Sequence, residues 1–285
     1  MENVVSSATV LWLAFAAAFV FGAIGQKTHF CTMGAVSDIV NMGDWTRARQ
    51  WLCAIGVAMI GFTALADFGL IDPSKTLYAS PRLMWLSTLV GGLMFGYGMV
   101  IASGCGNKTL VRMGGGNLKS VVVFVVMGVS AFATLKGITA VVRTNTVDTV
   151  FVDMPAGAHL SVLGIPHLGY ILGAVVLLWV LRHKDFWTFD SLLAGLGVGG
   201  LVVAMWWVSG HLGFVPEHPE TLDAVYLATS SGRIEAFNFV APVAYTLDWL
   251  MFYSDSSKVL SVGIAAVAGV LTGSAVSALQ SKTFR

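Results

Sequence analysis

The chain of 285 residues is strongly apolar, with a hydrophobic fraction of 56%, a charged fraction of 11% and a mean hydropathy of +0.79. Soluble domains carry about 25% charged residues, so this composition excludes an ordinary soluble protein. The net charge is only +1 and the charges stand in short stretches, so the chain has no basic face for nucleic acid. Three cysteines without a Cys-x-x-Cys pair predict neither a disulfide framework nor a zinc site.

Apolar runs of membrane-spanning character follow one another along the chain. A membrane helix needs about 20 mostly apolar residues, and Pro242 and Asp248 weaken one of the runs. The predicted spans are residues 8–24, 48–70, 83–103, 118–142, 167–182, 191–210, 258–279 and, as the weaker one, 237–253. We therefore expect an all-α integral membrane protein, a polytopic helical bundle that contacts the lipid bilayer and forms a single domain over residues 1–285.

Two stretches between the spans are too apolar for plain loops and too short to cross a membrane, namely residues 25–44 and 104–117. Irregular backbone at membrane depth is tolerated only where it is buried in protein or lines a cavity. We predict that both stretches are re-entrant or broken helical segments. A third stretch, residues 210–238, is polar and is expected to lie outside the bilayer.

The two re-entrant stretches share a local pattern. A Phe-Gly pair stands ten residues before Cys31, and another stands ten residues before Cys105. This predicts internal repeats, with a first repeat over about 8–142 and a second half over about 165–285. A weaker third copy places Ser209 at the position of the cysteines. Internal repeats with broken helices at matching positions indicate a transporter's binding site.

The candidate binding residues surround these two cysteines. They are Gln26, Lys27, Cys31, Gly104, Cys105, Gly106, Asn107 and Lys108. Each thiol has a lysine within four residues, and a cation beside irregular backbone favours a bound anion. The glycines around Cys105 permit close approach of a ligand. A single buried cysteine is most often an inert small hydrophobe, as we expect for Cys53, whereas two cysteines at matched positions favour a functional role.

The charged residues near the spans leave alternatives open. Lys27, Lys108 and Arg112 are either interfacial charges that extend to lipid headgroups or the electropositive mouth of an anion path. Carboxylates are costly at membrane depth, so we expect Asp38, Asp44 and Asp67 to lie near surfaces.

At these residues the chain resembles the YeeE/YedE family of sulfur-compound transporters. The matching stretches are Gly25-Gln26-Lys27-Thr28-His29-Phe30-Cys31-Thr32-Met33-Gly34-Ala35 and Ser103-Gly104-Cys105-Gly106-Asn107-Lys108-Thr109-Leu110-Val111-Arg112, continued by residues 114–120. The resemblance implies uptake of thiosulfate or a related sulfur anion through the bacterial inner membrane by a multi-pass protein. It also implies an hourglass of helices in which short re-entrant elements meet at the centre.

The resemblance further implies a relay in which the anion passes between cysteine thiols through S–H···S hydrogen bonds, without covalent chemistry, enzyme activity or a cofactor. Cys31 and Cys105 match two of the family's relay cysteines. Family members carry another cysteine motif after a segment similar to residues 281–285, where this chain stops. A C-terminally incomplete chain and a path completed by a second membrane subunit are both compatible with that difference.

Two other functions remain open from the residues alone. A membrane thiol-disulfide oxidoreductase would use Cys31 and Cys105 as a redox pair, which requires Cα atoms within about 7 Å of each other. An accessory subunit would need a partner to form a pore. A selenium compound is an alternative substrate for the transporter.

Overall fold

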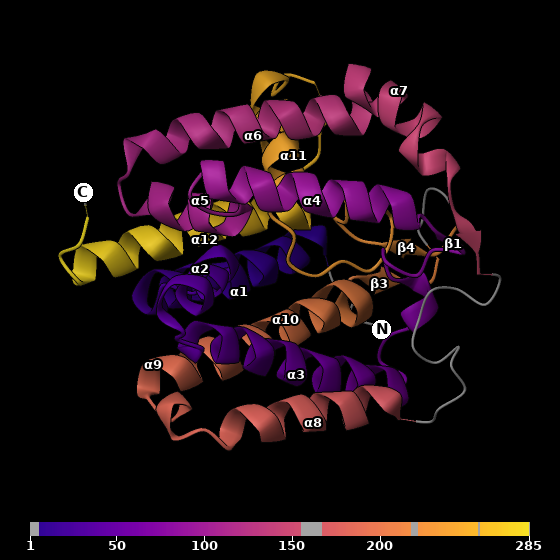
Figure 1. Cartoon of the computed structure of the whole chain (residues 1–285). Helices are drawn as coiled ribbons and strands as arrows, with labels where there is room; N and C mark the ends of the chain where they lie inside the picture. The colour runs from indigo at the N-terminus through magenta and orange to yellow at the C-terminus, as the bar shows by residue number, and fades with distance from the viewer. Residues whose placement is uncertain (1–5, 155–166, 218–221, 256, 285) are drawn as a thin grey trace.

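The computed structural model describes residues 6–154, 167–217, 222–255 and 257–284, and these ranges are mostly helical (Figure 1). The α-helices are α1 (Ser7–Thr28), α2 (Thr32–Met42), α3 (Thr46–Asp67), α4 (Trp85–Ile101), α5 (Gly106–Gly114), α6 (Leu118–Lys136), α7 (Ile138–Asn145), α8 (Leu168–Leu181), α9 (Phe189–Leu192), α10 (Val198–Trp207), α11 (Val240–Met251) and α12 (Val262–Gln280).

Shorter elements connect these helices. The 3₁₀ turns are η1 (Pro73–Lys75), η2 (Val147–Thr149) and η4 (Lys184–Phe186), and the π-helical segments are η5 (Leu193–Gly197) and η6 (Val208–Leu212). Two antiparallel pairs of two-residue strands join β1 (Arg82–Leu83) to β2 (Val152–Asp153) and β3 (Phe214–Val215) to β4 (Val225–Tyr226). The all-α prediction therefore describes the helical bundle correctly but misses these two short strand pairs in the connecting loops.

Six helical segments in the described ranges are long and apolar enough to cross a membrane, which makes this a multi-pass membrane protein. They are Ser7–Met42, Thr46–Asp67, Trp85–Gly114, Leu118–Lys136, Phe189–Leu212 and Val262–Gln280. The sequence predicted eight. The other two are present as α8 and α11, but with 14 and 12 residues they fall short of the roughly 20 residues that a span requires.

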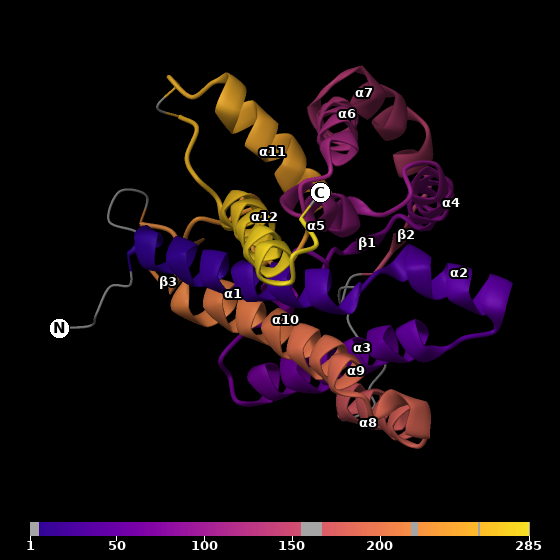
Figure 2. The same cartoon turned by 90° about the vertical axis from the view of Figure 1, so that its left-hand side faces the viewer.

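The centre of the bundle is formed by α1 and α12, which lie between a group with α3, α8 and α10 and a group with α4, α6 and α11 (Figures 1 and 2). Glycines let these two helices approach closely, as is common in membrane bundles. A Cβ added to Gly269 would lie 2.6 Å from the Phe15 carbonyl oxygen, and one added to Gly22 would lie 2.8 Å from the Val270 Cα atom.

The short helix α5 packs onto this central pair. Its Leu110 and Val111 are buried in the same apolar cluster as Phe21 and Val270. Both predicted re-entrant stretches, residues 25–44 and 104–117, thus contain a short helix, α2 or α5, that follows a break after a long helix. They are not extended loops, so this part of the prediction is confirmed.

The helix α4, which leads into Cys105, is exposed or half-buried along its whole length among the described residues. None of its residues is buried. A Cβ added to Gly91, Gly92, Gly96 or Gly98 would have no atom of the described chain within 4 Å. The last residues of this helix, Val100 and Ile101, are exposed as well, and among the described elements α4 packs mainly against η2.

Candidate functional site

The two cysteines occupy equivalent positions at two breaks in the helices. Each is the residue that caps the N-terminus of a short helix: Cys31 precedes α2 and Cys105 precedes α5, and both have extended backbone. Two residues before each cysteine the backbone is left-handed, at His29 with φ 53° and at Ser103 with φ 56°. The left-handed residue ends the preceding run of helix and turns the chain, so that the thiol stands at the start of the next helix.

The short helices also end in the same way. Left-handed glycines follow α2 and α5, at Gly43 with φ 68° and at Gly116 with φ 94°. The next residue in each case has a side-chain oxygen that accepts a backbone N–H two residues later. Asp44 accepts from Thr46 at 2.9 Å, and Asn117 accepts from Lys119 at 3.0 Å. The same local geometry therefore occurs twice, from the break before each thiol to the start of the next long helix.

Cys31 lies in a crowded environment. Only 4% of its surface is exposed, and its Sγ accepts a hydrogen bond from the Gly34 N–H at 3.4 Å. The preceding residue, Phe30, stacks on Trp51 of α3 with 4.7 Å between the ring centroids. The sulfur thus acts as the helix cap of α2, and the stacked rings fix the chain that leads into it.

Cys105 is half-buried, and its side chain makes no capping hydrogen bond. The buried glycines on either side of it let other groups come close. A Cβ on Gly106 would lie 3.2 Å from the Val240 side chain, and one on Gly104 would lie 2.8 Å from the side chain of Lys108. The Asn107 Oδ1 atom is buried without a hydrogen-bond partner among the described residues, so this break offers an unused polar group beside a free thiol.

The structure brings the two thiols and several cations together. Cys105 lies within electrostatic range of Cys31, and Lys108 lies within that range of both thiols. Arg112 and Arg47 also interact with Lys108. Both thiols are free, as predicted. Cations around two thiols at helix N-termini make a site that favours a small anion.

Lys27 and Gln26 do not join this cluster. The Lys27 ammonium group lies over the ring of Phe189, 4.8 Å from its centroid. Both side chains line an open cavity of about 680 Å³ at the C-terminal ends of α1 and α12. The other residues that line it are His29, Ser277, Gln280, Ser281, Lys282 and Thr283.

A second cavity, of about 260 Å³, lies at the other end of α12. Its polar lining includes Tyr78, Glu235, Asn238 and Tyr245. Val240, which contacts the start of α5, is adjacent in sequence to Ala241 and Pro242 in the wall of this cavity. At the other end of α5, a Cβ on Gly115 would lie 3.5 Å from the Gln26 amide nitrogen in the first cavity. The short helix α5 therefore extends from the neighbourhood of one cavity to that of the other.

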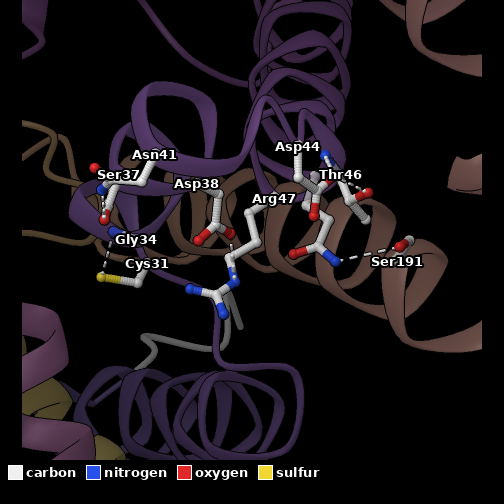
Figure 3. A network of polar contacts seen from close by, with 10 residues as sticks. Cys31, Gly34, Ser37, Asp38, Asn41, Asp44, Thr46, Arg47 and Ser191 are labelled. Atoms are coloured by element: carbon white, nitrogen blue, oxygen red, sulfur yellow. Dashed lines mark hydrogen bonds and ion pairs between the residues drawn. The ribbon is translucent and has the colours of Figure 1, made fainter.

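The three acidic residues that we expect near the membrane surfaces differ in their burial within the protein. Asp44 and Asp67 are exposed, but Asp38 is buried with 6% of its surface accessible. The Arg47 Nε atom lies 3.2 Å from the Asp38 Oδ2 atom, which explains how the carboxylate is tolerated inside the protein (Figure 3). Arg47 was not among the predicted site residues. The available signal was an acidic residue inside an apolar re-entrant stretch, because such a residue usually has a partner.

Two further expectations concern residues outside the cluster. Cys53 is fully buried, and a Cβ on Gly195 would lie 2.7 Å from its Sγ atom, so this thiol is packed against η5 as expected. Ser209, the weaker third match, lies in the π-helical segment η6 and donates a hydrogen bond to the Glu235 carbonyl oxygen. It does not start a short helix, so the local geometry of the two cysteines does not recur there. Among the described residues, no group of His, Cys, Asp and Glu is arranged to hold a metal ion.

Comparisons with known proteins agree on a transport function. Residues 27–285 match the family described as Sulphur transport. The chain is 26% identical over 275 residues to the thiosulfate transporter TsuA of Escherichia coli (strain K12), an alignment that covers 93% of this chain and 73% of the relative. It is 27% identical over 129 residues to TsuA of Spirochaeta thermophila, which covers 45% of this chain and 37% of the relative. It is also 27% identical over 94 residues to the probable transporter YedE of Escherichia coli (strain K12), covering 32% and 21%.

Proposed function

Because this chain belongs to the Sulphur transport family, we propose that it carries thiosulfate, or a closely related sulfur-containing anion, across the bacterial inner membrane. The family description is one of transport and not of enzyme activity. The single observation that carries the finer proposal is the pair of free thiols, Cys31 and Cys105, at equivalent helix starts within electrostatic range of each other and of Lys108. The substrate named for one relative, thiosulfate, has a terminal sulfur atom that suits a thiol partner.

The proposed path runs between the two cavities beside α5. At one end, Lys27 and Lys282 line the larger cavity and provide positive charge that attracts an anion from solution. The anion then passes the two thiols and reaches the smaller cavity through the gap near Gly106 and Val240. The matched geometry of the two breaks supports an internal repeat whose copies meet at this path.

The thiols suit transport because they bind weakly. A cysteine S–H is a weak donor, and its sulfur is a weak acceptor. A conduction site must bind its ligand well enough to admit it but weakly enough to release it, and several weak sites in series satisfy that condition. Lys108 supplies the long-range attraction, while the thiols supply short contacts that break easily.

Uptake of radiolabelled thiosulfate into proteoliposomes that contain only this chain tests the proposal. We expect uptake that unlabelled thiosulfate suppresses and that sulfate does not, with sulfite and selenite as further competitors. Cys105→Ala should remove the uptake, and Cys53→Ala, which changes a packed thiol outside the cluster, is the matched control. If proteoliposomes with this chain alone show no uptake, and uptake appears when a second membrane protein is reconstituted with it, the path needs a partner subunit. Equal suppression by sulfate would contradict the role given to the thiols.

A further inference from the structure

We propose that Arg47 is a substrate-binding residue of the same site. Its guanidinium group holds the oxygen atoms of a small oxyanion beside Cys31, and Asp38 positions it. This inference rests on the proposed function, because it assigns the part of the substrate that the thiols leave unrecognised. The sulfur end of the anion faces the cysteines and the oxygen end faces Arg47.

The ion pair holds the guanidinium group beside Cys31. Arg47 stands in the first turn of α3, and its Nε atom is occupied by the buried Asp38 carboxylate of α2 at 3.2 Å. A Cβ placed on Gly34 would lie 2.5 Å from the Arg47 Nη1 atom and 3.5 Å from the Cys31 Cβ atom. The guanidinium group therefore lies near the Cys31 Cβ atom at the start of α2, and the Cys31 sulfur points away from it in Figure 3.

The remaining guanidinium nitrogens are available for a ligand. Among the described residues, Asp38 is the carboxylate partner of Arg47, and it engages the Nε atom. Its side chain is 39% exposed, so solution can reach it. A planar guanidinium group presents two parallel N–H donors that match two oxygens of an oxyanion, a geometry that a lysine ammonium group does not provide.

One further cation lies close to both Arg47 and the thiol. Lys108 is within electrostatic range of Arg47 and of Cys31. Asp38 contacts Arg47 directly, and the exposed Asp44 also lies within electrostatic range of it. An anion at this place would therefore lie beside Arg47 and Lys108, and the nearer of the two carboxylates is already engaged by the Arg47 Nε atom.

Gly34 makes a sharp test possible. Gly34→Ala adds a methyl group 2.5 Å from the Nη1 atom, so the flexible end of Arg47 must move while its charge and its ion-pair partner are kept. Alanine is also a better helix former than glycine inside α2, so the fold is not weakened. Arg47→Gln removes the charge, and Arg47→Lys keeps the charge but loses the planar fork. The double variant Arg47→Gln with Asp38→Asn avoids an unpaired buried carboxylate.

The experiment measures the affinity of the purified chain for thiosulfate by titration calorimetry in detergent, together with KM and maximal rate of uptake in proteoliposomes. Charge-assisted hydrogen bonds contribute enough that we expect Arg47→Gln and the double variant to weaken binding and raise KM by about tenfold or more. Gly34→Ala should raise KM with a nearly unchanged maximal rate, and Arg47→Lys should fall between Arg47→Gln and the parent. Arg82→Gln, which breaks an exposed Arg–Asp pair far from the thiols, is the matched control and should change neither value.

The outcomes separate this inference from the proposed function. If the parent binds thiosulfate and Arg47→Gln binds it more weakly, the inference holds even when no uptake is found. If the parent takes up thiosulfate and the folded double variant and Gly34→Ala keep its KM and affinity, Arg47 is a structural residue and the inference is wrong. A parent that neither binds nor transports thiosulfate overturns both.

Discussion

The breaks at Cys31 and Cys105 share one backbone geometry but place their thiols in different states. The Cys31 sulfur is buried and accepts the Gly34 N–H, so it is held as a helix cap. Cys105 is half-buried, and the N–H groups of Asn107 and Lys108 lie near its sulfur without forming a capping hydrogen bond like that of Cys31. The neighbouring Asn107 Oδ1 atom is unpaired among the described residues. The same backbone geometry thus occurs with a hydrogen-bonded thiol at Cys31 and with a thiol that caps no helix at Cys105.

The two breaks are also stabilised by different interactions. At the first, the buried Asp38 pairs with Arg47, so the short helix α2 is joined to the long helix that follows it. At the second, Arg112 of α5 donates a hydrogen bond to the Ser103 carbonyl oxygen at 2.8 Å and holds the break itself. Both breaks thereby gain an arginine, but among the described residues only the first arginine has a carboxylate partner. The comparison suggests that Cys105 provides the contact that forms and breaks most readily, and that the Cys31 side provides orientation.

The largest expected effect comes from Cys105→Ala. Alanine keeps a small volume but offers the anion neither donor nor acceptor, so we expect uptake to fall by about tenfold or more, since a hydrogen bond to a charged group contributes about 1.5–3 kcal/mol. Radiolabelled thiosulfate uptake at equal protein per vesicle measures the effect. Cys105→Ser refines the result: serine should also fail if the site needs sulfur, and should work if any hydroxyl or thiol suffices. Full uptake by Cys105→Ala would remove this thiol from the path.

Replacing Cys31 separates its capping role from its role in transport. Cys31→Ser supplies an oxygen that accepts the Gly34 N–H, whereas Cys31→Ala loses the cap and should cost about 1 kcal/mol of stability. Thermal unfolding in detergent should therefore separate the two variants. Because the sulfur is already engaged, we expect uptake by Cys31→Ser to fall only about threefold, within the net contribution of one hydrogen bond. A loss as large as that of Cys105→Ala would show that the two thiols are equivalent.

The residues that follow the two short helices, Asp44 after α2 and Asn117 after α5, differ in their response to pH. Hydrogen bonds from the Thr46 hydroxyl and N–H hold the pKa of Asp44 below its ordinary value, so its contribution to stability is present above the ordinary carboxyl pKa and is lost as pH falls through the lowered one. Asn117, the equivalent residue, does not titrate. We expect hydrogen exchange at the start of α3 to increase in acid and exchange at the start of α6 to stay unchanged. Asp44→Asn should remove the difference; a persisting acid response would place its origin elsewhere.

Cys53→Ala should have the smallest effect. The thiol is packed against Gly195 of η5, away from the candidate path. Its loss leaves a small cavity that costs about 1 kcal/mol, at the low end of large-to-small core substitutions. The melting temperature should fall slightly while uptake per folded molecule stays equal to that of the parent. A selective loss of uptake would mean that the path runs closer to α3 than the two breaks indicate.

Much of the candidate site could be predicted from local sequence. Irregular, glycine-rich backbone beside Cys105 and the matched position of Cys31 indicated both breaks, and the short helices α2 and α5 follow them. The prediction of eight spans was less successful, because two of the predicted apolar runs were shorter than the roughly 20 residues that a span requires. The helix α8 (Leu168–Leu181) nearly fills its predicted run of residues 167–182, and α11 (Val240–Met251) lies inside its predicted run of residues 237–253.

The sequence by itself determined the class of protein, the sites of the breaks and the two thiols at their ends, because apolar length, glycine and helix-capping residues act over a few positions along the chain. Only the tertiary structure decided which charges meet those thiols. Lys27 turns towards Phe189, whereas Lys108 lies near both cysteines. The pairing of Asp38 with Arg47 forms when α2 folds back on α3. These choices depend on contacts between separate elements, where the energy of burying a charge is set by the partner that packing provides.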